Sequence, residues 1–184
     1  EKLMNEVSKI FGIDAHWNSL ATYRDVRMRL CSGQSQRLPF RSGTFQLITS
    51  AWLLEHLNAP HATLLEVRRV LAPGGHFIFL TPNRRNPLLL ANRLSGWLPA
   101  LQRALVRHLY ERNPADTFPL RYRANTRHKL QQVSRDSGLK LLSLKTVRDP
   151  TYAAFNEILF RALIALEDLL PSGLGVHLVG ILRR

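Results

Sequence analysis

Cysteine is nearly absent from this chain of 184 residues, with Cys31 as its single representative. An internal disulfide framework is therefore excluded, and one thiol is typical of a reducing compartment such as the cytoplasm. No apolar run reaches the length of a membrane span, because the best candidate, residues 158–170, contains Arg161, Glu167 and Asp168. The seven histidines and one cysteine have no metal-ligand spacing, so we expect no metal site. Internal repeats and low-complexity segments are absent as well.

Acidic residues are also scarce, since 13 Asp and Glu stand against 26 Lys and Arg and give a formal charge of +13. Most of the excess positive charge lies in residues 84–148, which contain 14 Lys and Arg and only three Asp and Glu. Such a basic block attracts phosphates, anionic lipid headgroups or acidic substrates, although a solvated face is an equally good explanation. A nucleic-acid binder ranks last, because no aromatic-basic RNA motif or base-reading helix pattern accompanies the charge.

The stretch from Leu38 to Asn83 has the pattern of a βαβ unit. Residues 45–50 (FQLITS) form a short apolar run suited to a strand that is covered on both faces. Asn58 and Pro60 indicate a helix start, and the run Pro73-Gly74-Gly75 indicates its end. Residues 76–81 are again apolar enough for a central parallel strand. Ligands of such units bind at the carboxyl ends of the strands, which here are residues 50–52 and 81–83.

The rest of the chain continues this alternation of strands and helices. Periodicity and turn residues predict an α/β domain of ordinary core size. The expected strands are residues 10–14, 26–31, 139–147 and 176–182, and the expected helices are residues 16–23, 126–137 (with Gly138 as C-terminal stop) and 151–170.

The sequence resembles the class I S-adenosylmethionine-dependent methyltransferases (methyltransferase type 11-like), among them the quinone-biosynthesis enzymes. The likeness rests on LPF, FQLITSAWLLEHL, LLEVRRVLAPGG and a strand that ends in TPN, all within residues 38–83. It implies a Rossmann-like, mostly parallel sheet of order 3-2-1-4-5-7-6, with a helical insertion after strand 5. It also implies three parts: a cofactor-binding core (residues 1–83), an insertion over the substrate pocket (84–125) and a C-terminal part of the same domain (126–184).

One departure from the family concerns its first strand and glycine-rich loop, which have no counterpart here. Residues 1–9 resemble the helix that follows this loop, and residues 10–14 resemble the second strand. We therefore expect that the sequence lacks roughly the first 40–50 residues of a complete domain, judged from typical βαβ lengths. The alternative is a natural protein that lost its cofactor loop and serves as a catalytically inactive binding module.

The resemblance places the cofactor S-adenosylmethionine at the carboxyl ends of these strands. Asp14 would hold the ribose hydroxyls, although a turn or N-cap aspartate has the same pattern. Gln34 stands where the family often has Asp against the adenine amino group, and its amide oxygen can still accept. The full set of expected cofactor-binding residues is Asp14, Ala15, Gln34, Ser35, Gln36, Ser50, Ala51 and Trp52.

Only a few residues are candidates for catalysis or for binding the methyl acceptor. His56 has the type and position of a general base, although a hydrogen-bonded structural histidine is the commoner case. Trp52 is expected to pack on the cofactor, to wall off the substrate pocket or to lie in the core. Tyr122 and Arg123 are substrate-binding candidates, because the aromatic and basic residues 116–125 lack helical periodicity. The reactive sulfonium needs mainly alignment and exclusion of water, so few catalytic residues are expected.

Residues 84–112, which belong to the expected insertion, indicate which class of methyl acceptor the protein binds. Residues 84–112 carry leucines on one helical face and arginines on the other, with Trp97 and with a division near Gly96 and Pro99. Such a helix suits peripheral membrane contact and an apolar acceptor, and it suits equally a helical pair packed on the domain. We therefore expect methyl transfer to a small-molecule or lipid-like acceptor by a cytoplasmic protein, with peripheral membrane contact through residues 84–112 as one of the two interpretations.

Overall fold

The computed structural model describes residues 10–15, 20, 28–31, 35–87, 89–90, 119–149 and 157–184. The chain divides into two compact units, residues 1–39 and residues 40–184. In the first unit, strand β1 (Phe11–Asp14) pairs in parallel with strand β2 (Met28–Cys31), and Asp14 is the last residue of its strand. Both strands were expected from their apolar patterns.

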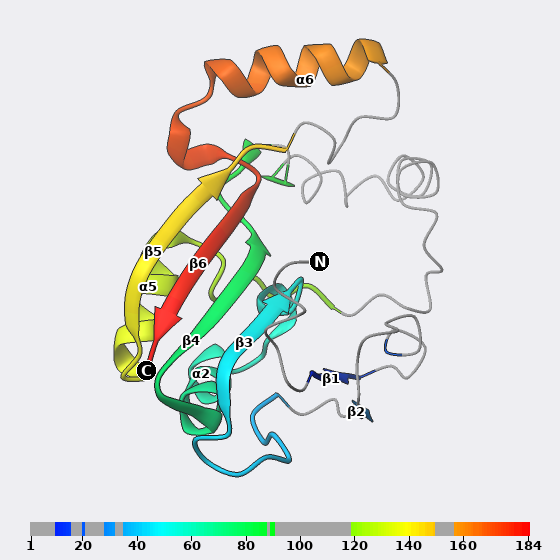
Figure 1. Cartoon of the computed structure of the whole chain (residues 1–184). Coiled ribbons are helices and arrows are strands. Elements are labelled where there is room, and N and C mark those ends of the chain that lie inside the picture. Colours follow the sequence, from blue (N-terminus) through cyan, green and yellow to red (C-terminus); the bar gives the residue numbers. More distant parts are fainter. Residues whose placement is uncertain are drawn as a thin grey trace. The chain divides into compact units, whose positions relative to one another are not determined.

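The second unit is built on a four-stranded sheet of order β3-β4-β6-β5 (Figure 1). Strands β3 (Phe45–Ala51) and β4 (Leu71–Pro82) are parallel, and β6 (His177–Arg183) is antiparallel to both β4 and β5 (Lys140–Val147). This arrangement matches positions 4-5-7-6 of the expected sheet, and β1 and β2 match positions 2 and 3. The expected α/β fold is confirmed, and its last two strands are antiparallel to each other.

Helix α2 (Pro60–Val70) connects β3 to β4. It begins with Pro60 at its first position, where a missing N–H costs nothing, but its N-cap is Ala59 and no side chain caps it. The helix ends at Val70, earlier than Pro73-Gly74-Gly75 predicts, because the chain turns directly into β4 and these three residues form an irregularity in the strand. A β-carbon on Gly75 would lie 2.9 Å from the Ala72 carbonyl oxygen, so the irregularity needs glycine there.

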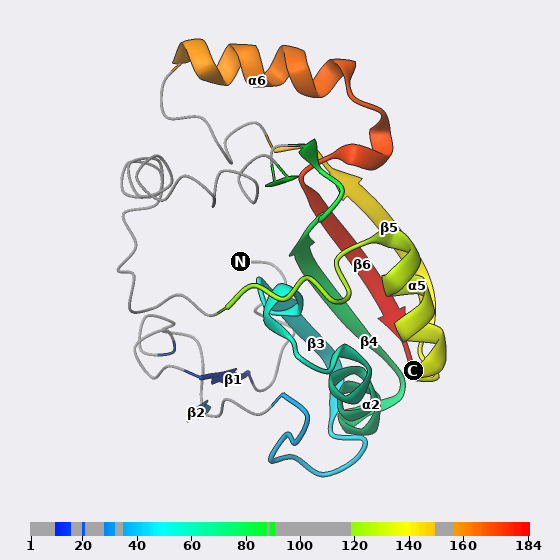
Figure 2. The same ribbon diagram turned by 180° about the vertical axis from the view of Figure 1, so that it is seen from behind.

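Helix α5 (Arg127–Asp136) begins and ends as its sequence predicts. The Thr126 hydroxyl accepts a hydrogen bond from the Lys129 N–H as N-cap, and Gly138 follows the helix in the left-handed region at φ +68°. Helices α2 and α5 lie on the same face of the sheet (Figures 1 and 2). They meet where the His61 ring hydrogen-bonds the Asp136 carbonyl oxygen at 3.3 Å.

The core lies between these two helices and the sheet. Its central contact is that of Phe79 with Gly180 across β4 and β6, where a β-carbon at position 180 would be 2.1 Å from the phenyl ring. The buried core comprises Leu54, Leu57, Leu64, Val67, Leu71, Phe77, Phe79, Ala124, Leu130, Leu139, Leu178 and Leu182.

Between β5 and β6 the chain forms helix α6 (Glu157–Leu169) and a 3₁₀ turn, η4 (Ser172–Leu174). Arg148, just after β5, donates to the Asp168 carboxylate at 2.8 Å and to the Leu170 carbonyl oxygen at 3.2 Å, which joins α6 to the end of the sheet. Among the described helices, none is long and apolar enough to cross a membrane. The expected helices over residues 16–23 and 84–112 lie almost wholly outside the described residues.

Candidate active site at the carboxyl ends of the strands

Four chain segments meet at one edge of the four-stranded sheet. Strands β3, β4 and β5 end there at Ala51, Pro82 and Val147, and the antiparallel β6 begins there at His177. Pro82 and Val147 are the direct cross-strand partners of His177. In an open α/β sheet this is the edge at which ligands bind.

A 3₁₀ turn, η1 (Leu54–His56), follows β3 and carries a buried carboxyl group into this edge. The Thr81 hydroxyl donates to Glu55 Oε2 at 3.0 Å, and the Asn125 amide donates to the Thr81 oxygen at 2.6 Å. All three side chains are buried. This chain of hydrogen bonds ties η1 to the end of β4 and to the segment that precedes α5.

Burial raises the pKa of the Glu55 carboxyl group above its ordinary value of 4.5, because it penalises the charged form. The hydrogen bond from its own backbone, the neighbouring His56 and the hydrogen bond from Thr81 act in the opposite direction but are weaker. The His56 Nε2 atom lies 3.9 Å from Glu55 Oε1. The carboxyl group is thus held in surroundings that favour its neutral form.

The loop of residues 119–125 is fixed to η1 by its backbone. The N–H groups of Arg121 and Tyr122 both donate to the Glu55 carbonyl oxygen, at 2.7 and 3.0 Å. The His56 ring bonds the Pro119 carbonyl oxygen through Nδ1 at 3.3 Å. Because a carbonyl oxygen only accepts, Nδ1 carries the proton and the other ring nitrogen, Nε2, is the proton acceptor in the neutral ring.

Two aromatic residues at this edge have strained backbones. Trp52 (φ +58°) and Tyr122 (φ +51°) are the non-glycine residues with positive φ in the described part of the chain. The left-handed conformation costs about 1–2 kcal/mol for a residue with a β-carbon. Such strain persists where surrounding contacts enforce it, and it concentrates at functional sites.

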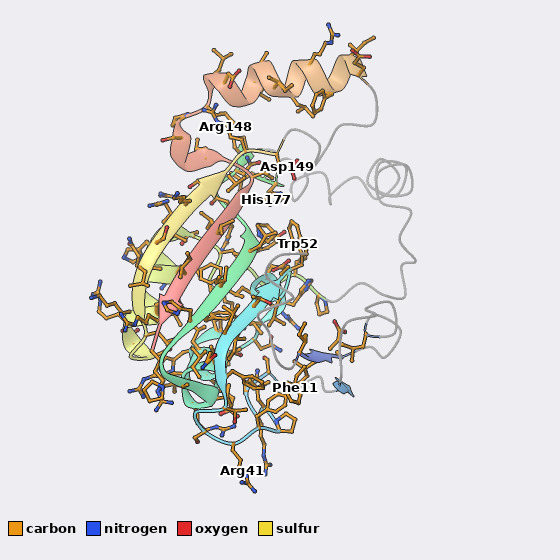
Figure 3. The ribbon with its side chains drawn as sticks, viewed as in Figure 1. Phe11, Arg41, Trp52, Arg148, Asp149 and His177 are labelled. Carbon is orange, nitrogen blue, oxygen red and sulfur yellow. The ribbon has the colours of Figure 1, made fainter. Side chains whose placement is uncertain are left out.

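The Trp52 ring stands against a buried histidine, which is paired with a partly exposed aspartate. The ring centroids of Trp52 and His177 are 4.9 Å apart in an edge-to-face arrangement, and His177 Nε2 lies 3.0 Å from Asp149 Oδ2. Figure 3 shows Trp52, His177 and Asp149 next to one another at this end of the sheet. His177 is 4% exposed, whereas Trp52 is 40% exposed, so one side of the indole faces outward.

Two buried asparagines support the edge from the η4 side. The Asn83 amide donates to the carbonyl oxygens of Gly173 and Gly175, at 3.1 and 2.9 Å. The Asn86 amide donates to the Leu174 carbonyl oxygen at 2.7 Å. These bonds fix the start of β6, and with it His177, beside the end of β4.

The structure brings together one group of the residues that the sequence singles out. Ser50, Ala51, Trp52, His56, Tyr122 and Arg123 all lie around β3, η1 and the loop that hydrogen-bonds to η1. Arg123 donates to the Asn58 carbonyl oxygen at 2.7 Å. The other cofactor candidates belong to the unit of residues 1–39: Asp14 ends β1, Ala15 follows it, Ser35 and Gln36 form a turn, and Gln34 lies outside the described residues.

Sequence reasoning gave no role to Glu55, Thr81, Asn125, Asp149 or His177. The position of Asp149 and His177 could have been inferred from topology. An antiparallel closing strand begins at the edge where the parallel strands end, and His177 is the first residue of such a strand. No signal identified the hydrogen bonds that connect Glu55 to Thr81 and Thr81 to Asn125, since Thr81 and Asn125 are 26 and 70 residues away from Glu55 in the chain.

Comparison with known proteins shows what the first part of the chain resembles. Residues 1–79 match the sequence model of the methyltransferase domain family, which is less than half of the chain. Over this stretch the chain is similar to the class I methyltransferases. A demethylmenaquinone methyltransferase from Symbiobacterium thermophilum is 32% identical over 85 residues, which is 41% of this chain and 34% of that protein. The chain thus spans about a third of the length of this curated relative.

Solved structures of methyltransferases share the fold of this chain over nearly its whole length. An S-adenosylmethionine-dependent methyltransferase from Mesorhizobium loti superimposes with a TM-score of 0.60 at 17% identity, covering 97% of this chain and 81% of that one. A geranyl diphosphate C-methyltransferase from Streptomyces coelicolor, in complex with Mg²⁺, geranyl diphosphate and S-adenosylhomocysteine, gives a TM-score of 0.59 at 12% identity and covers 100% and 65%.

S-adenosylmethionine is the cofactor of this family, and one residue of the second unit suits it. Ser50 Oγ is buried at the end of β3 and makes no hydrogen bond within the described part of the chain. A buried hydroxyl without a partner is uncommon and suits a ligand that supplies one. The resemblance of the sequence to the methyltransferases places Ser50 among the expected cofactor-binding residues.

Proposed function

We propose that the protein transfers the methyl group of S-adenosylmethionine to a small, apolar, lipid-like acceptor. The observation that carries this proposal is the match of residues 1–79 to the methyltransferase domain, together with β3 and β4 as parallel strands whose carboxyl ends carry the site. The cofactor supplies an activated methyl group. Asp14, Ser50 and the backbone after β3 would hold it, and the residues of the second unit would orient the acceptor.

Apolar side chains around η1 support an apolar acceptor. Trp52 and Leu53, directly before η1, are exposed by 40% and 36%, and Leu120, in the loop that bonds to η1, is exposed by 56%. Exposed apolar groups that gather beside polar ones are typical of a ligand site. The names of similar proteins agree, because one acts on demethylmenaquinone and another was solved with geranyl diphosphate.

His56 is the general base of this proposal. Its Nδ1 proton is engaged by the Pro119 carbonyl oxygen, so that in the neutral ring Nε2, 3.9 Å from Glu55 Oε1, is the atom that would take a proton from the acceptor. Its side chain is 25% exposed, so the ring can be reached from outside. Removal of a proton is needed when the methyl group goes to a carbon or to a neutral hydroxyl group.

The proposed location is the cytoplasm, at a membrane surface that holds the acceptor. Contact through residues 84–112 is supported at their described beginning, where Arg84 and Arg85 are exposed beside the exposed Leu90. Sedimentation with vesicles that contain anionic lipid tests this location. Binding that disappears when the vesicles are neutral supports it, and no sedimentation with either vesicle contradicts it.

The test of the activity uses the full-length protein and S-adenosylmethionine labelled in its methyl group. Reduced demethylmenaquinone and geranyl diphosphate serve as the two acceptors, and the label in the organic product is measured. We expect label in at least one product, and much less when His56 is replaced by Gln. No transfer to either acceptor, with intact cofactor binding, contradicts a lipid-like acceptor.

A further inference from the structure

A row of basic residues crosses three strands at the edge of the four-stranded sheet that lies opposite the candidate active site. Arg183, at the end of β6, is the direct cross-strand partner of His76 on β4 and of Lys140 at the start of β5. In Figure 1 the arrowhead of β6 and the starts of β4 and β5 mark this edge. Direct partners have β-carbons about 4.5–5.5 Å apart and project from the same face of a sheet. The three side chains therefore form one cluster, the basic row.

The basic row lies on the face of the sheet that α2 and α5 do not cover. Side chains alternate between the two faces along a strand, and the neighbouring residues Phe77, Leu182 and Leu141 pack in the core beneath these helices. The members of the row consequently project from the opposite face, which is turned toward the viewer in Figure 1, while Figure 2 shows the face with the helices. Arg183 and Lys140 are exposed, and the third member of the row is half-buried.

The charge of the basic row is not balanced within the described part of the chain. Among the described residues, no acidic side chain forms an ion pair with Arg183, Lys140 or His76. Arg183 and Lys140 are like charges directly opposite each other, an arrangement that destabilises a pair of strands. The Arg183 guanidinium group extends to Gly74, where a β-carbon would lie 3.6 Å from Nη2. A bound anion would neutralise this cluster and remove the repulsion.

We propose that the basic row binds two neighbouring phosphate groups, which belong either to a soluble phosphoester or to a lipid headgroup. A guanidinium group binds phosphate oxygens through two parallel hydrogen bonds, an ammonium group binds them as a point charge, and an imidazole N–H donates to them. Neighbouring strands are about 4.8 Å apart, so the row extends over about 10 Å, which two phosphate groups fill better than one. The site is separate from the methyl-transfer site and does not depend on the proposed function.

The test is calorimetric titration of the full-length protein with pyrophosphate and with inorganic phosphate, without divalent cations and at an ionic strength of about 0.15 M. We expect saturable binding of pyrophosphate, and an affinity for phosphate that is lower by about tenfold or more. Arg183→Gln should weaken pyrophosphate binding about tenfold or more, because charge-assisted hydrogen bonds are lost. Equal affinities for the two ions would contradict a site for two phosphate groups.

Lys140→Gln and Lys145→Gln are a matched pair of variants. Both lysines are exposed on β5, and each substitution removes one positive charge. Lys145, however, has Val179 as its cross-strand partner and lies about 15 Å along the strand from Lys140, beyond the screening length of about 8 Å. We expect Lys140→Gln to weaken pyrophosphate binding about threefold or more and Lys145→Gln less than twofold. Equal effects would mean unspecific attraction to a basic protein and would overturn the site.

Sedimentation with vesicles distinguishes the two sources of phosphate. The vesicles consist of phosphatidylcholine alone or with phosphatidylinositol bisphosphate. Pyrophosphate binding without sedimentation assigns the site to a soluble phosphoester. Sedimentation that needs the bisphosphate, and that Lys140→Gln lowers more than Lys145→Gln, assigns it to a lipid headgroup. If the protein neither binds pyrophosphate nor sediments in this way, the phosphate site is wrong, and the proposed methyl transfer, which is measured separately, is unaffected.

Discussion

The hydroxyl group of Thr81 donates a 3.0 Å hydrogen bond to the carboxyl group of Glu55, and both side chains are buried at the carboxyl end of β4. A buried carboxyl group is unfavourable unless its oxygens are bonded, so this contact stabilises the position of η1. The same turn contains His56, follows Trp52 by two residues and accepts a hydrogen bond from the backbone N–H of Tyr122. The Glu55–Thr81 contact therefore supports the geometry of the whole candidate site.

Replacement of Glu55 by Gln should change the pH dependence of stability. Burial raises the pKa of Glu55 in the folded state, so its contribution is present in full below 4.5 and is lost as the pH rises through the raised pKa. Glutamine does not titrate. We therefore expect the stability of Glu55→Gln, relative to wild type, to increase from pH 4 to pH 7.5 in urea unfolding. A difference that stays constant with pH contradicts the raised pKa.

Replacement of Thr81 by Val removes one hydroxyl group at nearly constant shape. It leaves the carboxyl group of Glu55 and the amide of Asn125 buried without this partner, which should lower the free energy of unfolding by about 1–3 kcal/mol. Thr49→Val, at an exposed position of β3, is the control and should stay within about 0.5 kcal/mol. Equal effects of the two substitutions would mean that the buried hydrogen bonds contribute little.

Replacement of Gly180 by Ala should strongly destabilise the sheet. The added methyl group would lie 2.1 Å from the Phe79 ring, and overpacking of a core costs about 1–3 kcal/mol or more. Gly173→Ala is a matched control, because a β-carbon there has no atom within 4 Å. The measurement is the urea unfolding midpoint of both variants. A lower unfolding midpoint in Gly173→Ala alone, or an equal decrease in both variants, contradicts the packing of β4 on β6.

Most of the fold could be predicted because its elements have local signals. Pro60, Thr126 and Gly138 mark helix ends, and short apolar runs mark the strands. The early end of α2 was missed because the irregularity at Pro73–Gly75 depends on pairing with β3. The strain at Trp52 and Tyr122 was equally hidden, since backbone hydrogen bonds to η1 and to β4 impose it and neither residue type favours it.

The candidate site could be predicted only where it follows a strand. Ser50 lies at the end of β3, Trp52 comes directly after the strand and His56 one turn later, so topology alone places them at the ligand-binding edge. His177 and Asp149 form their contact across 28 residues, and a sequence contains no signal for such a pair unless the antiparallel closing strand is already assumed. The domain division at residues 83 and 125 and the roles of the site residues stay predictions.

Replacement of His56 by Gln tests the general base. Loss of a positioned base typically lowers a rate about 10²–10⁴-fold, and the affinity for S-adenosylhomocysteine should not change, because the ring acts on the acceptor. His61→Gln is the control, since His61 bonds the Asp136 carbonyl oxygen at the α2–α5 contact, away from the site. If the methyl-transfer rate of His56→Gln is within twofold of the wild-type rate, His56 is not the general base.

The most direct measurement of the central claim, that this fold holds S-adenosylmethionine, is calorimetric titration of the full-length protein with S-adenosylhomocysteine. The account predicts saturable binding of one molecule per chain, weakened about tenfold or more in Asp14→Ala because a charge-assisted hydrogen bond to the ribose is lost. The absence of heat at millimolar ligand, from protein that unfolds cooperatively, would contradict it.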